Sequence, residues 1–237
     1  VNDDINVEKI IFRNTSLGYA CGGRKGEIGC IYTTTDGGQS WQRIYNCSQS
    51  LYDVEFLNDS IGYACGDNMT ILKTNNGGKT WLLQHPYQPL SGFECPLRSI
   101  CSIDSSTCYI IGGKGFSVGL SYKTFNAGNE WIYNTYDKEL RNIYFKDRHN
   151  GLLVGYGGWL KTTDSLNSTQ PLSLSGDFYT CVSFIDPSLG YACGYNGGIY
   201  KTTNFGNTFS QLLNENSALS DGRHFNGIDF KDTNNGC

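Results

Sequence analysis

The sequence predicts an all-β fold built from repeated four-stranded units, and three observations support this prediction. A short phrase, first seen as Thr-Asp-Gly-Gly-Gln-Ser-Trp at residues 35–41, occurs five times at nearly even spacing. Between the copies, apolar and polar residues alternate as they do in strands with one buried face. The chain of 237 residues contains 30 glycines, 14% aromatic and 17% charged residues, which is typical of short strands joined by tight turns.

The repeated phrase sets the length of the unit. Its equivalent acidic or amide residues are 40, 50, 38 and 40 residues apart, and they are Asp36, Asn76, Asn126, Asp164 and Asn204. A period of this size, with strand-like sequence between the copies, indicates an array of small β-units. Four antiparallel strands in about forty residues form a blade of a β-propeller, whose circular closure hides most sheet edges. The sequence therefore predicts a single β-propeller domain.

Each predicted blade contains four strands. In the first blade we expect strands at 7–12, 18–22, 30–35 and 41–45. The later blades repeat the first strand with two apolar residues on one face, namely Val54/Phe56, Ile143/Phe145, Val182/Phe184 and Ile228/Phe230, while the third blade has Ile100/Ser102.

Five complete repeats are expected at approximately 7–50, 51–95, 96–138, 139–177 and 178–222, with part of a sixth at 223–237. We interpret the chain as an incomplete copy of a six- or seven-bladed propeller. The alternative is a five-bladed ring in which a terminal strand overlaps the seam.

The repeated phrase is expected to form the turn between the third and fourth strands. Its Asp or Asn side chain can accept hydrogen bonds from backbone N–H groups two or three residues further on. Its glycines supply backbone angles that side chains forbid, and its aromatic residue begins the outer strand and packs against the neighbouring sheet. The residues given this structural role are Asp36, Gly38, Trp41, Asn76, Gly78, Trp81, Asn126, Gly128, Trp131, Asp164, Asn204, Gly206 and Phe209.

The pattern S/T-x-D-x-G-x-T/S-W resembles the Asp-box, also called the bacterial neuraminidase repeat. Together with Gly-Tyr-Ala-Cys/Val-Gly two strands earlier, it makes residues 7–237 similar to the photosystem II stability and assembly factors and their bacterial secreted relatives. The resemblance implies structural boxes on the outer edge of the propeller and a non-enzymatic protein that holds a client polypeptide. It also implies a periplasmic, cell-surface or extracellular location, but not a photosynthetic client.

Sialidases share the Asp-box, so catalytic residues were considered. Their site requires three arginines and the mark Phe/Tyr-Arg-Ile-Pro, whereas this chain has Phe-Arg-Asn-Thr at 12–15. Asp53 and Asp229 are interpreted as solvated residues at strand ends, and three histidines lack ligand spacing: His85, His149 and His224. No catalytic residue, metal site or cofactor is predicted. The alternative is a carbohydrate-active propeller, either a glycosidase or a lectin-like glycan binder, and acids roughly 5–10 Å apart on the channel would favour hydrolysis.

Most of the ten cysteines are expected to be packing residues. Cys21, Cys65 and Cys193 share a position that Val154 and Ile111 occupy in other repeats, which indicates a small buried apolar slot. Two local pairs are possible disulfides: Cys101 with Cys108, and Cys21 with Cys30.

The predicted binding site is the mouth of the central channel. Counting back four residues from each first-strand Phe position gives Glu8, Tyr52, Arg98, Arg141, Thr180 and Asn226. Arg98 and Arg141 fall in adjacent blades, and two neighbouring guanidiniums can receive a carboxylate or an acidic peptide end. The alternative is that each arginine pairs with a local acid. Loops 85–96 and 212–224 are expected on the same rim, as contact loops or as plain connectors.

The charge of the chain limits its partners. A net charge of −4 and the lack of a Lys/Arg run argue against nucleic acid. No stretch reaches the length of a membrane helix, and no signal peptide opens the sequence, so we expect a mature or recombinant form. A protein or peptide client is expected, with a glycan as the alternative.

Overall fold

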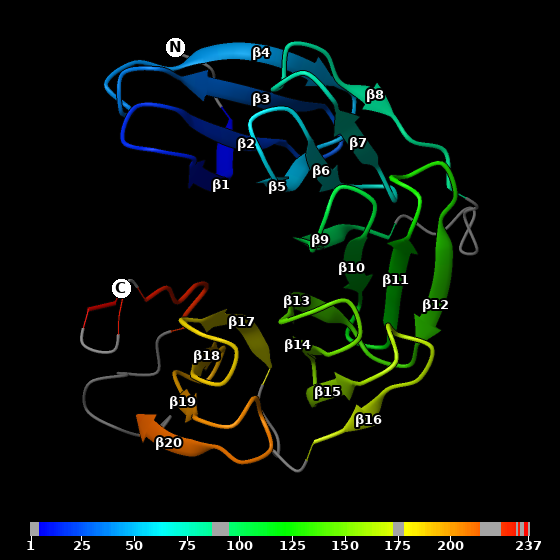
Figure 1. The fold of residues 1–237 in the computed structure, drawn as a ribbon, viewed down its shortest axis with the longest axis vertical. Helices are drawn as coiled ribbons and strands as arrows, with labels where there is room; N and C mark the ends of the chain where they lie inside the picture. Colours follow the sequence, from blue (N-terminus) through cyan, green and yellow to red (C-terminus); the bar gives the residue numbers. More distant parts are fainter. Residues whose placement is uncertain are drawn as a thin grey trace. The chain divides into compact units, whose positions relative to one another are not determined.

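The computed structural model describes residues 5–86, 95–172, 178–213, 224–230, 232, 235 and 236. The described residues form five four-stranded antiparallel sheets, and none of them lies in a helix (Figure 1). In each sheet, or blade, the strands are hydrogen-bonded in chain order. The predictions of an all-β fold and of five complete four-stranded repeats are therefore confirmed.

The strands of the five blades are as follows. Blade 1 contains β1 (Asn6–Phe12), β2 (Gly18–Arg24), β3 (Ile28–Thr34) and β4 (Gln42–Cys47). Blade 2 contains β5 (Leu51–Phe56), β6 (Gly62–Gly66), β7 (Ile71–Thr74) and β8 (Leu82–Leu83). Blade 3 contains β9 (Leu97–Ser102), β10 (Cys108–Lys114), β11 (Val118–Thr124) and β12 (Ile132–Tyr136). Blade 4 contains β13 (Leu140–Phe145), β14 (Gly151–Gly155), β15 (Gly158–Thr162) and β16 (Gln170–Pro171). Blade 5 contains β17 (Tyr179–Phe184), β18 (Gly190–Gly194), β19 (Ile199–Thr202) and β20 (Ser210–Leu213).

The chain divides into two compact units. The first consists of Val1–Lys114 and Leu120–Asn134, and the second of Gly115–Gly119 and Thr135–Cys237. Blades 1 and 2 and most of blade 3 belong to the first unit, whereas blades 4 and 5 belong to the second. The single-domain organisation with the repeat boundaries given above stays a prediction.

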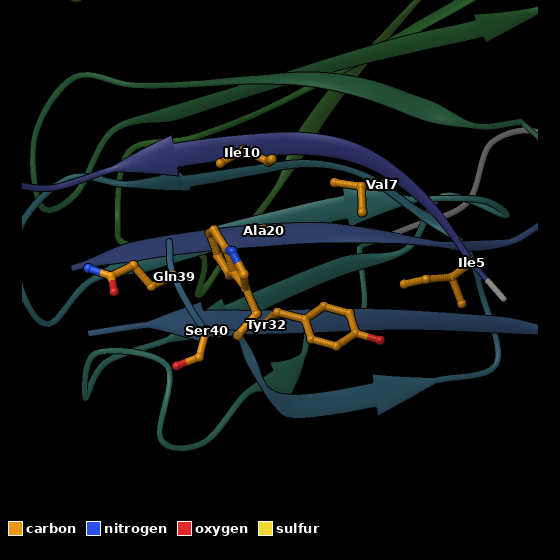
Figure 2. Close-up of a pocket in the computed structure, with 8 residues that line it drawn as sticks. Ile5, Val7, Ile10, Ala20, Tyr32, Gln39 and Ser40 are labelled. Atoms are coloured by element: carbon orange, nitrogen blue, oxygen red, sulfur yellow. The ribbon is translucent and has the colours of Figure 1, made fainter. Parts of the chain in front are cut away.

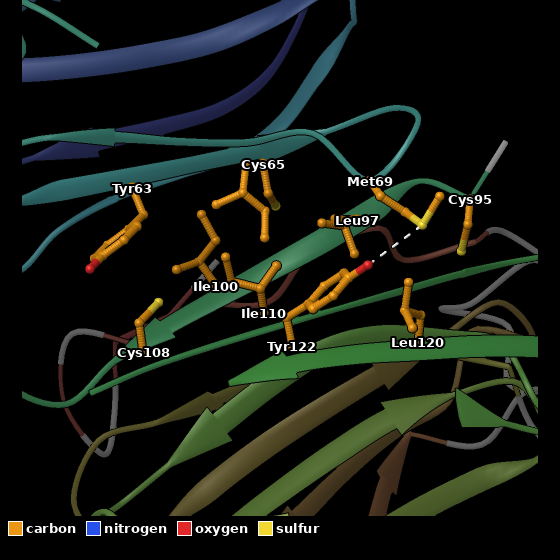
Figure 3. Packing of buried hydrophobic residues seen from close by; sticks show 11 residues of the cluster. Tyr63, Cys65, Met69, Cys95, Leu97, Ile100, Cys108, Ile110, Leu120 and Tyr122 are labelled. Atoms are coloured by element: carbon orange, nitrogen blue, oxygen red, sulfur yellow. Dashed lines mark hydrogen bonds between the residues drawn. The ribbon is translucent and has the colours of Figure 1, made fainter. Parts of the chain in front are cut away.

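Each unit has a core between successive blades. In the first unit, apolar residues of blades 2 and 3 interleave, and the Tyr122 hydroxyl donates a hydrogen bond to the Met69 sulfur at 3.7 Å (Figure 3). In the second unit, residues of blades 4 and 5 do the same around the fully buried Trp159. A blade with a neighbour on each side is covered on both faces. Successive residues of a strand near its centre are therefore buried, as in β6 and β14.

The motif Gly-Tyr-Ala-Cys-Gly has a steric explanation. A Cβ atom at Gly62 would lie 2.8 Å from the Phe56 ring, and one at Gly66 would overlap the carbonyl oxygen of Ser50. The Tyr of the motif stacks on the first-strand Phe that follows: the centroids of Tyr19 and Phe56 are 3.9 Å apart. The motif therefore fixes how one blade meets the next.

The repeated turn between the third and fourth strands is held by its own side chains. In blade 2, Thr74 Oγ1 donates to Asn76 Oδ1 at 3.0 Å and accepts from the Gly78 N–H at 3.0 Å. Asn76 Oδ1 accepts from the Thr80 N–H at 2.9 Å, four residues on rather than the two or three expected from sequence. The same bond, at 2.9 Å, recurs in the other blades from Ser40, Glu130, Ser168 and Thr208.

The blade 4 copy keeps this turn without the glycine pair. Ser165 and Leu166 adopt φ values of 63° and 61°, which side chains rarely adopt. Asp164 still receives the Ser168 hydroxyl and N–H, and these bonds lower the pKa of its carboxyl to about 2. The side-chain hydrogen bonds of Thr162 and Asp164 together therefore hold the turn without the glycines.

The aromatic residue of the phrase precedes the outer strand by one residue and contacts the preceding blade in three copies. Trp81 lies 6.5 Å from Tyr45, Trp131 lies 6.1 Å from Tyr63, and Phe209 lies 4.4 Å from Trp159 (ring centroids). Trp41 instead contacts Phe12 of its own blade at 6.1 Å.

The two proposed disulfides are wrong. All nine described cysteines are free thiols. In the β9–β10 ladder Cys101 is opposite Tyr109 and Cys108 is opposite Ser102, so the two cysteines point to opposite faces of the sheet. Cys21 and Cys30 are offset by one position in the β2–β3 ladder in the same way. The prediction that most cysteines pack in the interior holds, because six of the nine are buried.

Blade 1 differs from the others in one respect. Ile10 and Phe12 are 52% and 50% exposed, although their counterparts Val54 and Phe56 are buried. After blade 5, Phe230 stacks on Tyr191 at 3.8 Å, as Phe56 does on Tyr19. Phe230 therefore makes the contact that the first-strand Phe of a following repeat makes elsewhere. The total number of blades stays a prediction.

Candidate functional site

Three of the predicted mouth residues gather in the first unit. Glu8, Tyr52 and Arg98 come from the first strands of blades 1, 2 and 3. The Arg98 guanidinium carbon lies 4.1 Å from the centroid of the Tyr52 ring, and the Tyr52 hydroxyl donates to Asp67 Oδ1 at 3.0 Å. We call Glu8, Tyr52, Asp67 and Arg98 the polar cluster.

A β-bulge positions these side chains. The pairing register shifts between Val7 and Lys9, between Leu51 and Asp53, and between Leu97 and Ser99. The extra residues at these shifts are Glu8, Tyr52 and Arg98, and the last two remain half-buried although Leu51 and Leu97 beside them are fully buried. Asp67 follows β6, and its N–H donates to the Ser50 carbonyl at 2.9 Å, which ties its turn to the entrance of β5. The equivalence of the repeats therefore brings the three first strands and one turn together.

Burial shapes the electrostatics of the polar cluster. Burial raises the pKa of Tyr52 to about 12, and the nearby Asp67 carboxylate adds to the rise while Arg98 opposes it. Burial also raises the pKa of Glu8, again opposed by Arg98. Among the described residues, Arg98 Nε and Asp67 Oδ2 are buried without a hydrogen-bond partner. Unsatisfied groups of this kind carry an energetic cost that a ligand can relieve.

A cavity of about 370 Å³ opens beside the polar cluster. Three cationic side chains line it, together with the Asp67 carboxylate, and they are Lys25, Arg98 and Lys114. This size lies within the range of small-ligand pockets, and the excess of positive charge favours an anionic group.

The other predicted mouth residues belong to the second unit. Arg141 Nη2 lies 2.8 Å from Glu139 Oε1, and its guanidinium carbon lies 4.9 Å from the centroid of Phe178. Thr180 Oγ1 donates to the Phe225 carbonyl at 2.5 Å, and Asn226 is exposed. Arg141 thus pairs with a local acid, and its sharing of one ligand with Arg98 stays a prediction.

The predicted rim loops fall mostly outside the described residues. Of 85–96, residues 85, 86, 95 and 96 are described, and of 212–224, residues 212, 213 and 224 are described. Their role as contact loops stays a prediction.

Two carboxylates on β5 were missed or misread from the sequence. Asp53 is 7% exposed and accepts hydrogen bonds from the N–H groups of Val54 and Ile100, so its reading as a solvated residue is wrong. Glu55 Oε2 accepts from the Ser102 N–H at 2.8 Å, and burial next to Asp53 raises the pKa of Glu55 to about 8. The repeat itself was the available signal, because a blade that packs against a neighbour on each side covers both faces of a strand such as β5 and leaves none of its residues fully exposed.

The asparagine of blade 4 makes the corresponding contact. Asn142 Oδ1 accepts from the Val182 N–H of the next inner strand at 3.1 Å. Asp53 and Asn142 thus join successive inner strands, and a structural role accounts for the buried Asp53 carboxylate.

A second cavity, of about 420 Å³, is apolar and lies on the open face of blade 1 (Figure 2). Ile5, Val7, Ile10, Tyr32 and Trp41 line most of it. These residues occupy positions that face a neighbouring blade elsewhere in the chain, so the cavity is a packing surface rather than a site for chemistry.

Two further features are absent from the described residues. No group of three or more His, Cys, Asp or Glu side chains within them is placed to hold a metal ion. Nor do they form a helix long and apolar enough to cross a membrane.

The chain is similar to known assembly factors over part of its length. Residues 44–141 match the family model described as photosynthesis system II assembly factor YCF48. This segment includes Tyr52, Asp67, Arg98 and Arg141. No curated protein sequence matches the chain.

Three solved structures resemble the whole chain. YCF48 from Cyanidioschyzon merolae is 14% identical, with 100% of this chain and 92% of that chain covered, at a TM-score of 0.66. The GH74 enzyme of Niastella koreensis is 18% identical, with 94% of this chain but 42% of that chain covered, at a TM-score of 0.71. YCF48 bound to D1 peptide is 17% identical, with 100% and 90% covered, at a TM-score of 0.49. The first two alignments establish the β-propeller fold.

The resemblance to an Asp-box propeller related to the photosystem II assembly factors is therefore confirmed.

Proposed function

We propose that this protein is a non-enzymatic binding propeller that holds a polypeptide client through a carboxylate at the polar cluster. The observation that carries the proposal is the basic cavity beside Arg98, whose Nε is buried without a partner among the described residues. A carboxylate can accept two parallel hydrogen bonds from a guanidinium, and the Tyr52 ring holds the guanidinium plane in place.

The family match supports the class of ligand. The matched family is described as an assembly factor, and residues 44–141 include Tyr52, Asp67, Arg98 and Lys114, which contribute to the cluster and its cavity. We further propose that the protein works in the periplasm, at the cell surface or outside the cell, as a single propeller domain.

The alternative function is that of a carbohydrate-active propeller. Hydrolysis of a glycan would need two carboxyl groups that can both reach the bond to be broken. Asp53 and Glu55 are instead bonded to the backbone N–H groups of Ile100 and Ser102 on the next inner strand. This use of both carboxylates in packing supports a protein without hydrolytic activity.

The test is a pull-down from the native cell envelope with three immobilised forms: the wild type, Arg98→Ala and Arg43→Ala. Arg43 lies on the outer strand β4, so its variant is the matched control for loss of one positive charge. We expect a protein that the wild type and Arg43→Ala retain and Arg98→Ala does not. Amidation of the C-terminal carboxylate of a peptide from that protein should then weaken binding to the wild type. Equal retention by all three forms would contradict the proposal.

Arg141→Ala is the second variant in the same experiment. If Arg141 shares the client with Arg98, Arg141→Ala should retain clearly less of the client than the wild type does. If Arg141 acts only with Glu139, Arg141→Ala should retain as much as the wild type and Arg43→Ala.

A further inference from the structure

The second unit carries an exposed aromatic surface that the proposed function does not use. Phe116, Tyr156 and Tyr195 are 55%, 46% and 41% exposed, and the buried Phe178 lies among them. Ring centroids are 5.0 Å apart for Phe116 and Tyr156, 5.8 Å for Tyr156 and Phe178, and 5.4 Å for Phe178 and Tyr195. We call these four residues the aromatic ledge.

The repeat topology builds the aromatic ledge. Phe116, Tyr156 and Tyr195 all follow the second strand of a blade, so three successive blades contribute one exposed ring each. The N–H groups of Tyr156 and Tyr195 donate at 2.9 Å to the carbonyls of Glu139 and Phe178, which precede the first strands. The rings are therefore fixed to the framework of the blades.

Phe116 is held in a conformation that a bulky residue rarely adopts. Its φ is 66°, and two hydrogen bonds with the buried Glu139 secure it. The Phe116 N–H donates to Glu139 Oε2 at 2.9 Å, and the Glu139 N–H donates to the Phe116 carbonyl at 3.1 Å. Gly115 also has a positive φ, of 68°, so the conformation belongs to the short hairpin turn between β10 and β11, and this turn leaves the Phe116 ring exposed.

A pocket of about 320 Å³ lies at one end of the ledge. Its lining combines the Phe116 and Tyr156 rings, tilted by 44°, with polar groups of Ser117, Asp137 and Lys138. The volume lies at the lower end of the range for small-molecule sites, which pair apolar walls with a few polar groups.

The charges around the pocket balance. Asp137 and Lys138 carry one charge of each sign, and Glu139 is paired with Arg141 at 2.8 Å. A balanced site gives no net attraction to an anion or a cation, so the expected ligand is neutral. The pocket offers hydrogen-bonding groups on Asp137, Lys138 and Ser117 beside two aromatic rings. This combination suits a ligand with hydroxyl groups around an apolar face.

We propose that the aromatic ledge and its pocket bind a neutral oligosaccharide. One sugar ring places its C–H face on the Phe116 and Tyr156 rings, while its hydroxyls bond with Asp137, Lys138 and Ser117. The next sugar rings follow the aromatic ledge toward Tyr195. The site recognises and does not hydrolyse, and it is separate from the polar cluster of the first unit.

The test is a titration of the ¹⁵N-labelled protein with cellohexaose, maltohexaose and hexa-N-acetylchitohexaose, each up to about 10 mM, the weak end of specific binding. Backbone amide shifts report the contact. We expect one of these neutral probes to shift the amides of Phe116, Tyr156 and Tyr195 in a saturable manner.

Two variants remove the rings with little change to the framework. Tyr156→Ala truncates an exposed side chain, and Phe116→Asn keeps a residue type that tolerates positive φ. Each should weaken saccharide binding by about fivefold, which is the equivalent of about 1 kcal/mol for the loss of one aromatic contact. Tyr133→Ala, on the outer strand β12, removes an equally exposed tyrosine outside the ledge and should bind like the wild type.

Three outcomes would overturn the proposal. The first is the absence of shifts with all three probes. The second is saccharide binding that Tyr156→Ala and Phe116→Asn leave unchanged. The third is binding of decaproline, run in parallel, in place of the saccharides, which would assign the aromatic ledge to an extended polypeptide.

Discussion

The stability of the first unit should fall as the pH rises from about 5.5 to about 8, because of Glu55. Burial next to Asp53 raises the pKa of Glu55 from 4.5 to about 8. The folded protein therefore binds this proton more tightly than the unfolded chain does. The resulting stabilisation is fully present below pH 4.5, declines as the pH rises, and is lost above the folded pKa of about 8.

The magnitude follows from the size of the shift. A change from 4.5 to about 8 corresponds to about 5 kcal/mol if it is realised in full. Glu55 keeps part of its surface exposed, so solvent screens some of this effect, and we expect a loss of about 2–3 kcal/mol in the free energy of unfolding. Burial also raises the pKa values of Asp53 and Glu8, so their effect on stability has the same sign.

The assay is urea unfolding followed by tryptophan fluorescence at several pH values across this window. Four other shifted groups do not contribute in this window: Asp36 and Asp164 titrate near 2, and burial raises the pKa of the Cys21 and Cys65 thiols well above the usual value for cysteine. Glu55→Gln should flatten the pH dependence. Glu27→Gln, which removes an exposed carboxylate paired with Arg24, is the matched control and should keep the wild-type slope. A wild type that is equally stable at both ends of the window would refute the reasoning.

Three further substitutions test the framework by chemical denaturation. Thr74→Val should lower the free energy of unfolding by about 2 kcal/mol, since it leaves the Gly78 N–H without its acceptor; a loss below about 0.5 kcal/mol would contradict this account. Gly62→Ala should cost about 1–3 kcal/mol because the new methyl would lie 2.8 Å from the Phe56 ring, and Phe56→Leu should restore part of the loss. Glu139→Ala should cost about 3 kcal/mol and broaden the Phe116 amide signal, because it removes the buried carboxylate that pairs with Arg141 and accepts from the Phe116 N–H; an unchanged spectrum would argue against this role of Glu139.

The repeat made most of the fold predictable from sequence. Even spacing of the Asp36-type residues and the alternation around residues such as Phe56 specify four strands per blade, and these signals do not depend on distant contacts. Strand ends differ from the prediction by one or two residues, because the last pairs of a ladder depend on the neighbouring strand. The disulfide pairs failed for a related reason: a register offset of one residue puts Cys101 and Cys108 on opposite faces.

The candidate site was predictable only in part. Equivalence of first-strand positions led to Tyr52 and Arg98, which lie together with Glu8. It could not supply Asp67, which joins the polar cluster from the turn after β6. The aromatic ledge was also missed, because its rings stand singly in short loops and become one surface only when the blades are side by side.

Glu139 has a consequence for how the second unit responds to its ligands. One oxygen of its carboxylate binds the Arg141 guanidinium and the other binds the Phe116 N–H. An anion that draws Arg141 away leaves the Glu139 carboxylate less neutralised and less fixed in position. Because the same carboxylate accepts from the Phe116 N–H, the Phe116 turn is affected as well. Such coupling is reciprocal. If a bound sugar changes the affinity of Arg141 for an anion by some factor, the bound anion changes the affinity for the sugar by the same factor. An anion at Arg141 and a sugar at Phe116 would then change each other's affinity through the single buried carboxylate of Glu139.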